Sequence, residues 1–97
     1  MQIAEIRAFV AVATLGTVND AAVALQYSQS GVSRQVRTLE NQLGLQLFSR
    51  DRGRLALTRP GMEILPLAES ILALSDALVG SAHRNREPQP PRLQYRP

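Results

Sequence analysis

Residues 28–44 constrain the fold more than any other stretch, because their apolar and polar side chains separate at helical spacing. The apolar residues lie four, three and four positions apart, as on the buried face of an amphipathic helix: Val32, Val36, Leu39 and Leu43. The opposite side is polar: Gln29, Ser30, Ser33, Arg34 and Arg37. Ser28 suits the N-cap position, and Gly44 suits the left-handed residue that follows a helix. A helix with one buried side and one strongly polar side is therefore predicted.

Two helices are predicted before this stretch. The first, over residues 2–15, is indicated by an apolar stripe: Ile3, Ile6, Phe9 or Val10, and Ala13. Gly16 follows where a left-handed residue would end this helix. Asn19 is a suitable cap for a short second helix, roughly residues 20–26, which we expect to pack through Ala22 and Leu25.

A long helix is predicted from Thr58, a suitable N-cap, to about Arg84. Pro60 suits its first turn, whereas Pro66 should bend it because proline removes one backbone hydrogen bond. One apolar stripe has the spacing of a coiled-coil seam: Ile64, Leu67, Ile71, Leu74 and Leu78. A second stripe lies beside it: Leu65, Ala68, Leu72 and Val79. We expect one stripe to pack on the chain's own domain and the other to lack a partner within the chain.

Positive charge concentrates in one third of the chain, which includes the helix predicted over 28–44. All eleven basic residues are arginines, and residues 28–59 hold six of them against Glu40 and Asp51, which gives this segment a charge of +4. Three of the arginines lie in or beside "RDRGR", a polar turn between alternating apolar residues that predicts a hairpin with strands at 46–50 and 54–58. Arginine's planar fork fits phosphate groups and guanine edges. The alternative is that these arginines only keep a surface solvated.

The composition argues against several classes of function. The 97 residues suffice for one small domain. They include no cysteine and one histidine, His83, so a thiolate or histidine metal site and a histidine-based catalytic triad are not expected, and neither is a cofactor. We also expect no signal peptide and no apolar run long enough to cross a membrane, which indicates a cytoplasmic protein. The last twelve residues, "REPQPPRLQYRP", resemble a linker or a disordered tail.

The order of the predicted elements is that of a helix-turn-helix: helix, short helix, turn, and a helix with a polar outer side. The hairpin that follows makes it a winged helix-turn-helix. Arginine and glutamine at the start of such a helix can pair with guanine and adenine edges in the major groove. An arginine-rich hairpin could lie along the DNA backbone or reach a narrow minor groove. Each of these residues, taken alone, could equally be an ordinary solvent-facing side chain.

Residues 1 to about 84 resemble the N-terminal domain of the LysR-type transcriptional regulators. The resemblance runs through "IAEIRAFVAVATLGT", "AAVAL", "SQSGVSRQVRTLENQLGLQLFSR" and "LALTRPG". It implies a mainly α fold, a winged helix-turn-helix of three helices plus a two-stranded wing at 1–58, and a dimerisation linker helix at 59–84. It also implies binding to double-stranded promoter DNA by dimers or tetramers, and a larger C-terminal domain that senses a small molecule. That sensing domain is expected to be missing here, with 85–97 as the start of a hinge.

The resemblance and the residue patterns together define the expected sites. The DNA-binding residues are expected to be Ser28, Gln29, Ser30, Ser33, Arg34, Arg37, Arg50, Arg52, Arg54 and Thr58. The dimerisation residues are expected to be Ile64, Leu67, Ile71, Leu74 and Leu78. Ser30 stands where the family commonly has proline, and Gly31 where it commonly has alanine, so a less rigid start of the recognition helix is expected. A protein-interaction module and an RNA-binding domain remain as alternatives, and an enzyme is not expected.

Overall fold

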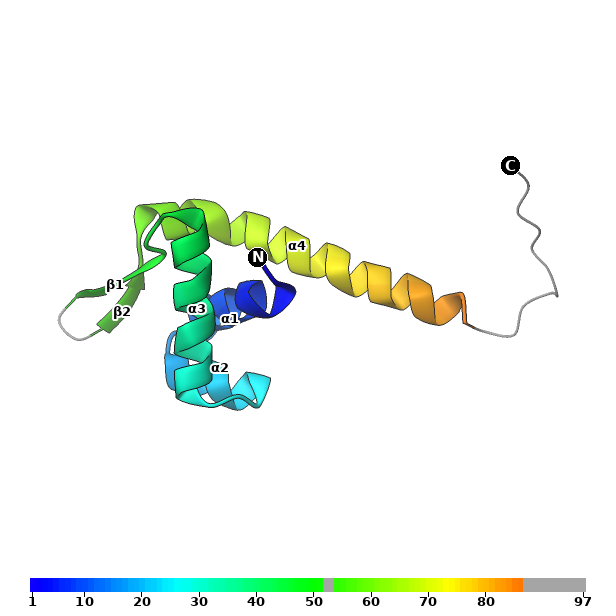
Figure 1. Cartoon of the computed structure of the whole chain (residues 1–97), viewed down its shortest axis with the longest axis horizontal. Coiled ribbons are helices and arrows are strands. Elements are labelled where there is room, and N and C mark those ends of the chain that lie inside the picture. The colour runs from blue at the N-terminus through cyan, green and yellow to red at the C-terminus, as the bar shows by residue number, and fades with distance from the viewer. Residues whose placement is uncertain (52–53, 87–97) are drawn as a thin grey trace.

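A computed structural model of the chain describes residues 1–51 and 54–86. In chain order the elements are α1 (Ile3–Leu15), α2 (Val18–Leu25), α3 (Gln29–Leu43), β1 (Phe48–Asp51), β2 (Arg54–Leu57) and α4 (Arg59–Arg84). The first three helices pack together, the hairpin projects from one side of them, and α4 leaves in the other direction (Figure 1). This arrangement is a winged helix-turn-helix followed by a long helix, which confirms the predicted fold class.

The first helix ends where the sequence indicated, at Gly16, which is left-handed with φ 92°. Its buried side includes Ile6 and Phe9, as predicted, whereas Ile3, the first residue of the predicted stripe, is 39% exposed. Ala8 and Val12 are buried as well, because α2 and α3 both pack against α1 and cover a wider arc than one stripe.

The prediction that Asn19 caps the second helix was wrong. Thr17 is the N-cap, and its Oγ1 accepts a hydrogen bond from the Asp20 amide at 3.0 Å. Because Thr17 and Asn19 are both good capping residues two positions apart, the sequence pattern could not separate them. The helix therefore starts at Val18, and Asn19 is a helical residue whose side chain is available for another contact.

The third helix has the predicted limits, with Ser28 as its N-cap and Gly44 left-handed at φ 70°. The predicted buried side is correct except for its last member: Val32, Val36 and Leu39 are buried, whereas Leu43 is 37% exposed. Leu43 is the last residue of α3, beyond the region that α1 and α2 cover.

The hairpin is antiparallel, with Phe48 paired to Leu57 and Asp51 paired to Arg54. The Glu40 carboxylate on α3 holds the start of the hairpin, because its Oε2 accepts hydrogen bonds from the Leu47 and Phe48 amides at 2.8 and 3.3 Å. The predicted strand ranges are confirmed to within two residues at each end. Residues 52–53, at the predicted turn, lie outside the described residues.

Two neighbouring clusters form the core. One joins α1, α2 and α3 through Val12, Ala21 and Val32, and the other joins α1 and α3 to α4 through Phe9, Leu39 and Ala68. Phe48 of β1 contacts both clusters, and its ring meets that of Phe9 edge-on with centroids 5.5 Å apart. The hairpin is therefore anchored to the same core that positions α3.

The long helix begins as predicted, with Thr58 as its N-cap and proline in its first turn, and it continues through Pro66 without a break. An 18-residue window within Arg59–Asn85 has a mean hydropathy of 1.5 and is only 6% buried, so the helix is long and apolar enough to cross a membrane. The expectation that no run has this length was therefore wrong. Composition alone is weak evidence for a membrane helix here, since Glu63, Glu69 and Asp76 are spaced along α4 and a charged residue at a bilayer centre costs at least about 2.5–3.5 kcal/mol.

Candidate nucleic-acid interface

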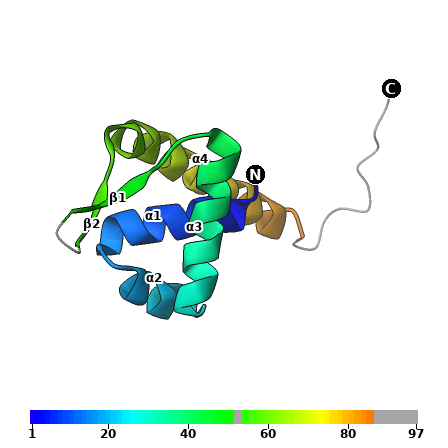
Figure 2. The ribbon, with the colours of Figure 1, turned by 60° about the vertical axis from the view of Figure 1, so that its left-hand side comes forward.

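The polar side of α3 is on the outside of the domain. Gln29, Ser30, Arg34 and Arg37 are exposed and Ser33 is half-buried. The helix lies across α1 and α2 with its outer side uncovered, and its N-terminal end sits beside α2 (Figure 2). An α-helix of 15 residues with one solvent-exposed side has dimensions that fit a DNA major groove.

Side-chain hydrogen bonds organise the first turn of α3. The Ser28 Oγ accepts from the Gly31 amide at 3.0 Å and lies 3.2 Å from the Ser30 hydroxyl. The Gln29 Nε2 donates to the Asn19 Oδ1 on α2 at 2.9 Å. Three of the predicted DNA-binding residues thus have partners within the domain. The sequence analysis missed Asn19, because a contact between side chains ten positions apart depends on how two helices meet.

The arginines of this surface are not neutralised by nearby acids. In the part of the chain that the structure describes, Arg34, Arg37 and Arg50 form no ion pair. By contrast, Arg7 lies 4.0 Å from Asp76 and Arg59 lies 3.8 Å from Glu63. The positive charge of α3 and β1 is therefore available for an outside anion.

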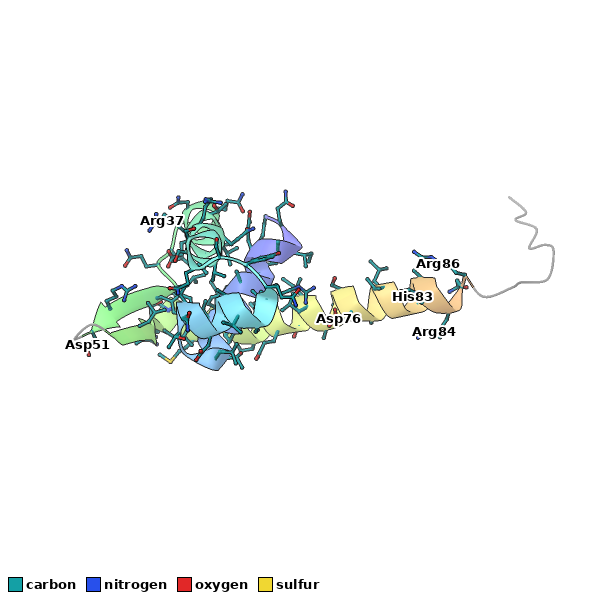
Figure 3. All side chains as sticks on the ribbon, turned by 90° about the horizontal axis from the view of Figure 1, so that it is seen from below. Arg37, Asp51, Asp76, His83, Arg84 and Arg86 are labelled. Atoms are coloured by element: carbon teal, nitrogen blue, oxygen red, sulfur yellow. The ribbon has the colours of Figure 1, made fainter. Side chains whose placement is uncertain are left out.

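Arg50 of β1 borders two shallow hollows that connect the hairpin to the helices. One, of about 440 Å³, lies between α3 and the hairpin and is also lined by Ser33 and Arg37. The other, of about 500 Å³, is lined by Asn19 and Gln29. Arg37 extends from α3 on the side that faces the hairpin (Figure 3). Arg37 of α3 and Arg50 of β1, which were predicted separately from the sequence, thus line the same hollow.

Thr58 has a structural role. Its hydroxyl donates to the Gln46 carbonyl at 2.6 Å and accepts from the Gly61 amide at 3.0 Å, and its own amide donates to the Leu47 carbonyl. These bonds tie the end of the hairpin to the start of α4. The hydroxyl's single proton is thereby used within the domain. Of the remaining predicted contacts, Arg52 and the side chain of Arg54 lie outside the described residues.

The apolar stripes of α4 divide between two environments. Ile64, Leu65 and Leu72 pack against the buried Ala68 and the core. Four residues at seam spacing face away from the domain and are exposed: Leu67 (65%), Ile71 (37%), Leu74 (70%) and Leu78 (71%). The structure thus leaves four of the five predicted dimerisation residues uncovered and turns Ile64 inward.

Residues 3–62 match the sequence profile of the bacterial regulatory helix-turn-helix proteins of the lysR family. The chain belongs to the lysR family. It is 42% identical over 86 residues to a probable hydrogen peroxide-inducible genes activator of Mycobacterium avium, and 35% identical over 91 residues to the transcriptional regulator YofA of Bacillus subtilis. These alignments cover 89% and 94% of the chain but only 28% and 32% of the relatives. The chain therefore spans under a third of their length.

Solved structures place the chain at the DNA-binding domain of this family. The BenM DNA-binding domain in complex with a catB site matches with a TM-score of 0.84 at 30% identity, over 92% of the chain and all of that domain. The CbnR DNA-binding domain in complex with DNA matches with a TM-score of 0.79 at 31% identity, over 90% of the chain and all of that domain. The lysR-family assignment extends to the long helix, since the alignments cover most of the described residues.

The lysR-family relatives agree with the expectation that the chain is not an enzyme. The relatives named above are transcription regulators rather than enzymes. Within residues 1–51 and 54–86, no group of three or more histidine, aspartate or glutamate side chains is positioned to hold a metal ion.

Proposed function

We propose that the chain binds double-stranded promoter DNA in a sequence-specific manner, as one half of a homodimer. The observation that carries this proposal is the exposed polar side of α3, on which Arg34 forms no ion pair among the described residues, together with the hollow that Arg37 of α3 and Arg50 of β1 both border. The likeness to two lysR-family DNA-binding domains that were solved with DNA supports it.

In this proposal, α3 enters the major groove and its N-terminal half reads base edges. Arg34 is suited to the O6 and N7 atoms of guanine, and Gln29 to the N6 and N7 atoms of adenine. Arg37 and Arg50 border the hollow between helix and hairpin, where they are positioned to neutralise phosphate groups. The hairpin would lie on the backbone or in the adjacent minor groove.

The second subunit is proposed to cover the exposed stripe of α4. Leu67, Ile71, Leu74 and Leu78 recur at four, three and four positions, so they form a continuous seam on one side of the helix. Two such seams packed together would remove these side chains from water, and each fully buried leucine contributes about 1.5–3 kcal/mol. Two copies related by a two-fold axis would then read two halves of an inverted repeat.

A protein that binds promoter DNA acts where the DNA is, so we propose that this protein is located in the bacterial cytoplasm. The curated relatives are about three times longer than the chain. We therefore propose that any small-molecule effector would bind outside this DNA-binding domain.

Selection from a pool of randomised duplexes with the purified chain tests this proposal. We expect the selected duplexes to share an inverted repeat, with the same bases enriched in both half-sites. If each subunit neutralises about three to five phosphates, the logarithm of the binding constant should fall with the logarithm of salt concentration with a slope of roughly −5 to −9. A pool that stays random, a preference for single-stranded RNA, or a slope near zero would contradict the proposal.

A further inference from the structure

The hydrogen bond between α2 and the first turn of α3 bears on base preference. Asn19 Oδ1 accepts from Gln29 Nε2 at 2.9 Å, and both residues are exposed at the edge of the hollow that Arg50 also lines. A glutamine amide has one carbonyl oxygen and two N–H donors. Bonding to Asn19 uses one donor and leaves Gln29 with one acceptor and one donor for an outside partner.

Neither helix needs the Asn19 side chain for its own start. Thr17 caps α2 by accepting the Asp20 amide and Ser28 caps α3 by accepting the Gly31 amide, so neither helix uses Asn19 as its N-cap. The side chain of Asn19 is exposed, and among the described residues its only side-chain hydrogen bond is the one with Gln29. Its effect is therefore on Gln29 and not on folding.

The remaining hydrogen-bonding groups of Gln29 distinguish the purines. Adenine presents the N6 amino donor and the N7 acceptor in the major groove, which an amide with one acceptor and one donor can satisfy together. Guanine presents two acceptors, O6 and N7, which require two donors. With one N–H already engaged, Gln29 can satisfy only one of them. The bond to Asn19 thus favours adenine over guanine.

We propose that Asn19 is a positioning residue that fixes the Gln29 amide in the orientation that selects adenine. This inference rests on the proposed function, because it assumes that α3 reads duplex DNA. It adds a residue on α2, outside the recognition helix, to the determinants of specificity. Ordering the amide before DNA arrives also reduces the side-chain entropy lost on binding.

The test compares Asn19→Ala with Asn19→Asp in the full chain. Alanine removes the acceptor, whereas aspartate keeps an oxygen acceptor in the same place and is favoured in the first turn of a helix. Gln29→Ala first identifies the base pair that Gln29 reads, as the position where discrimination falls by roughly 5- to 150-fold. Affinities are then measured for duplexes that carry each of the four base pairs at that position.

We expect Asn19→Ala to lower the preference for adenine over guanine by roughly 2- to 10-fold, the range of one net hydrogen bond. Asn19→Asp should keep the preference while weakening binding to every duplex, because its charge repels phosphates. In the free protein, the Gln29 side-chain amide signals in a nitrogen–proton NMR spectrum should shift in Asn19→Ala and remain near their original positions in Asn19→Asp.

An unchanged ratio of adenine to guanine in Asn19→Ala would overturn the inference, as would an equal loss of affinity for all four duplexes in both variants. So would a Gln29→Ala variant that keeps every base preference of the original chain. In each of these cases the original chain still binds duplex DNA, and the proposed function stands. If the original chain binds no duplex, the proposed function fails and this inference fails with it.

Discussion

Arg34 is the residue that combines exposure, free charge and a central place on the outer side of α3. Because it has no ion pair among the described residues, its guanidinium can turn toward a base edge without breaking an internal contact. Arg34→Ala should weaken binding to the selected site by about 1–3 kcal/mol and relax the preference at one base position. Fluorescence anisotropy titrations with the selected duplex and its single-position variants measure both effects.

Arg84→Ala is the matched control, since it removes the same charge at the far end of α4, away from the hairpin (Figure 3). It should leave base preference unchanged. If Arg34→Ala instead weakens binding to all sequences equally, Arg34 contacts a phosphate and does not read a base.

Glu40 matters to the hairpin although it is an acidic residue within a positively charged segment. Its carboxylate accepts hydrogen bonds from the partly buried amides of Leu47 and Phe48. Glu40→Ala should lower the free energy of unfolding by about 1–3 kcal/mol, because two amides lose their partner. Glu40→Gln keeps a carbonyl oxygen and should lose less. Urea unfolding measures the difference, and an Asn41→Ala control with the same loss would show that these two hydrogen bonds contribute nothing.

At the scale of elements, sequence reasoning found what depends on neighbours along the chain. Ser28, Gly44 and Thr58 mark helix limits through bonds to residues three or four positions away, so the limits of α3 and the start of α4 were predictable. The spacing of Val32, Val36 and Leu39 likewise revealed the buried side of α3. These signals require no knowledge of how the helices meet.

The features that the sequence did not reveal depend on contacts between elements. Asn19 meets Gln29 only because α2 and α3 cross at their starts, and Glu40 reaches Leu47 only because the chain turns back after Gly44. Ile64 packs against the core because of the direction in which α4 leaves the hairpin. Spacing identified both apolar stripes of α4 but could not decide which of them the domain would cover.

Gly61 lets the start of α4 lie close to the hairpin. A Cβ at this position would meet the Leu47 carbonyl oxygen and the Leu57 side chain, so only glycine lets the start of α4 pack against the hairpin. Gly61→Ala should therefore destabilise the fold by about 1–3 kcal/mol, the usual cost of overpacking. Gly80→Ala is the control on the same helix, where the added carbon makes only an ordinary contact with Arg84.

Because alanine favours helices, Gly80→Ala should be neutral or stabilising by up to about 1 kcal/mol. Thermal unfolding of both variants measures the contrast. Equal melting temperatures in the two variants would show that the start of α4 can shift to accommodate a side chain.

For the whole molecule, the exposed stripe of α4 links oligomeric state to DNA binding. Leu74 and Leu78 are each about 70% exposed, so replacing both by glutamine should leave the monomer folded. Burial of two leucines per subunit stabilises a dimer by several kcal/mol, and the double variant should raise the dimer dissociation constant at least about 100-fold. Sedimentation equilibrium measures this change. Ala73→Gln, a substitution at an exposed position of α4 outside the stripe, should leave the dimer intact.

The same variants predict how binding depends on salt. The salt slope counts neutralised phosphates and does not depend on affinity itself, so a monomer on one half-site should have half the slope of a dimer on two. We expect the Leu74→Gln, Leu78→Gln variant to show a slope of roughly −2.5 to −4.5 and the Ala73→Gln control to keep the dimer's value. A variant that is monomeric in solution but retains the full slope would contradict this prediction. The phosphates of both half-sites would then still be neutralised in a single binding event, so a surface other than α4 would hold the two DNA-bound subunits together.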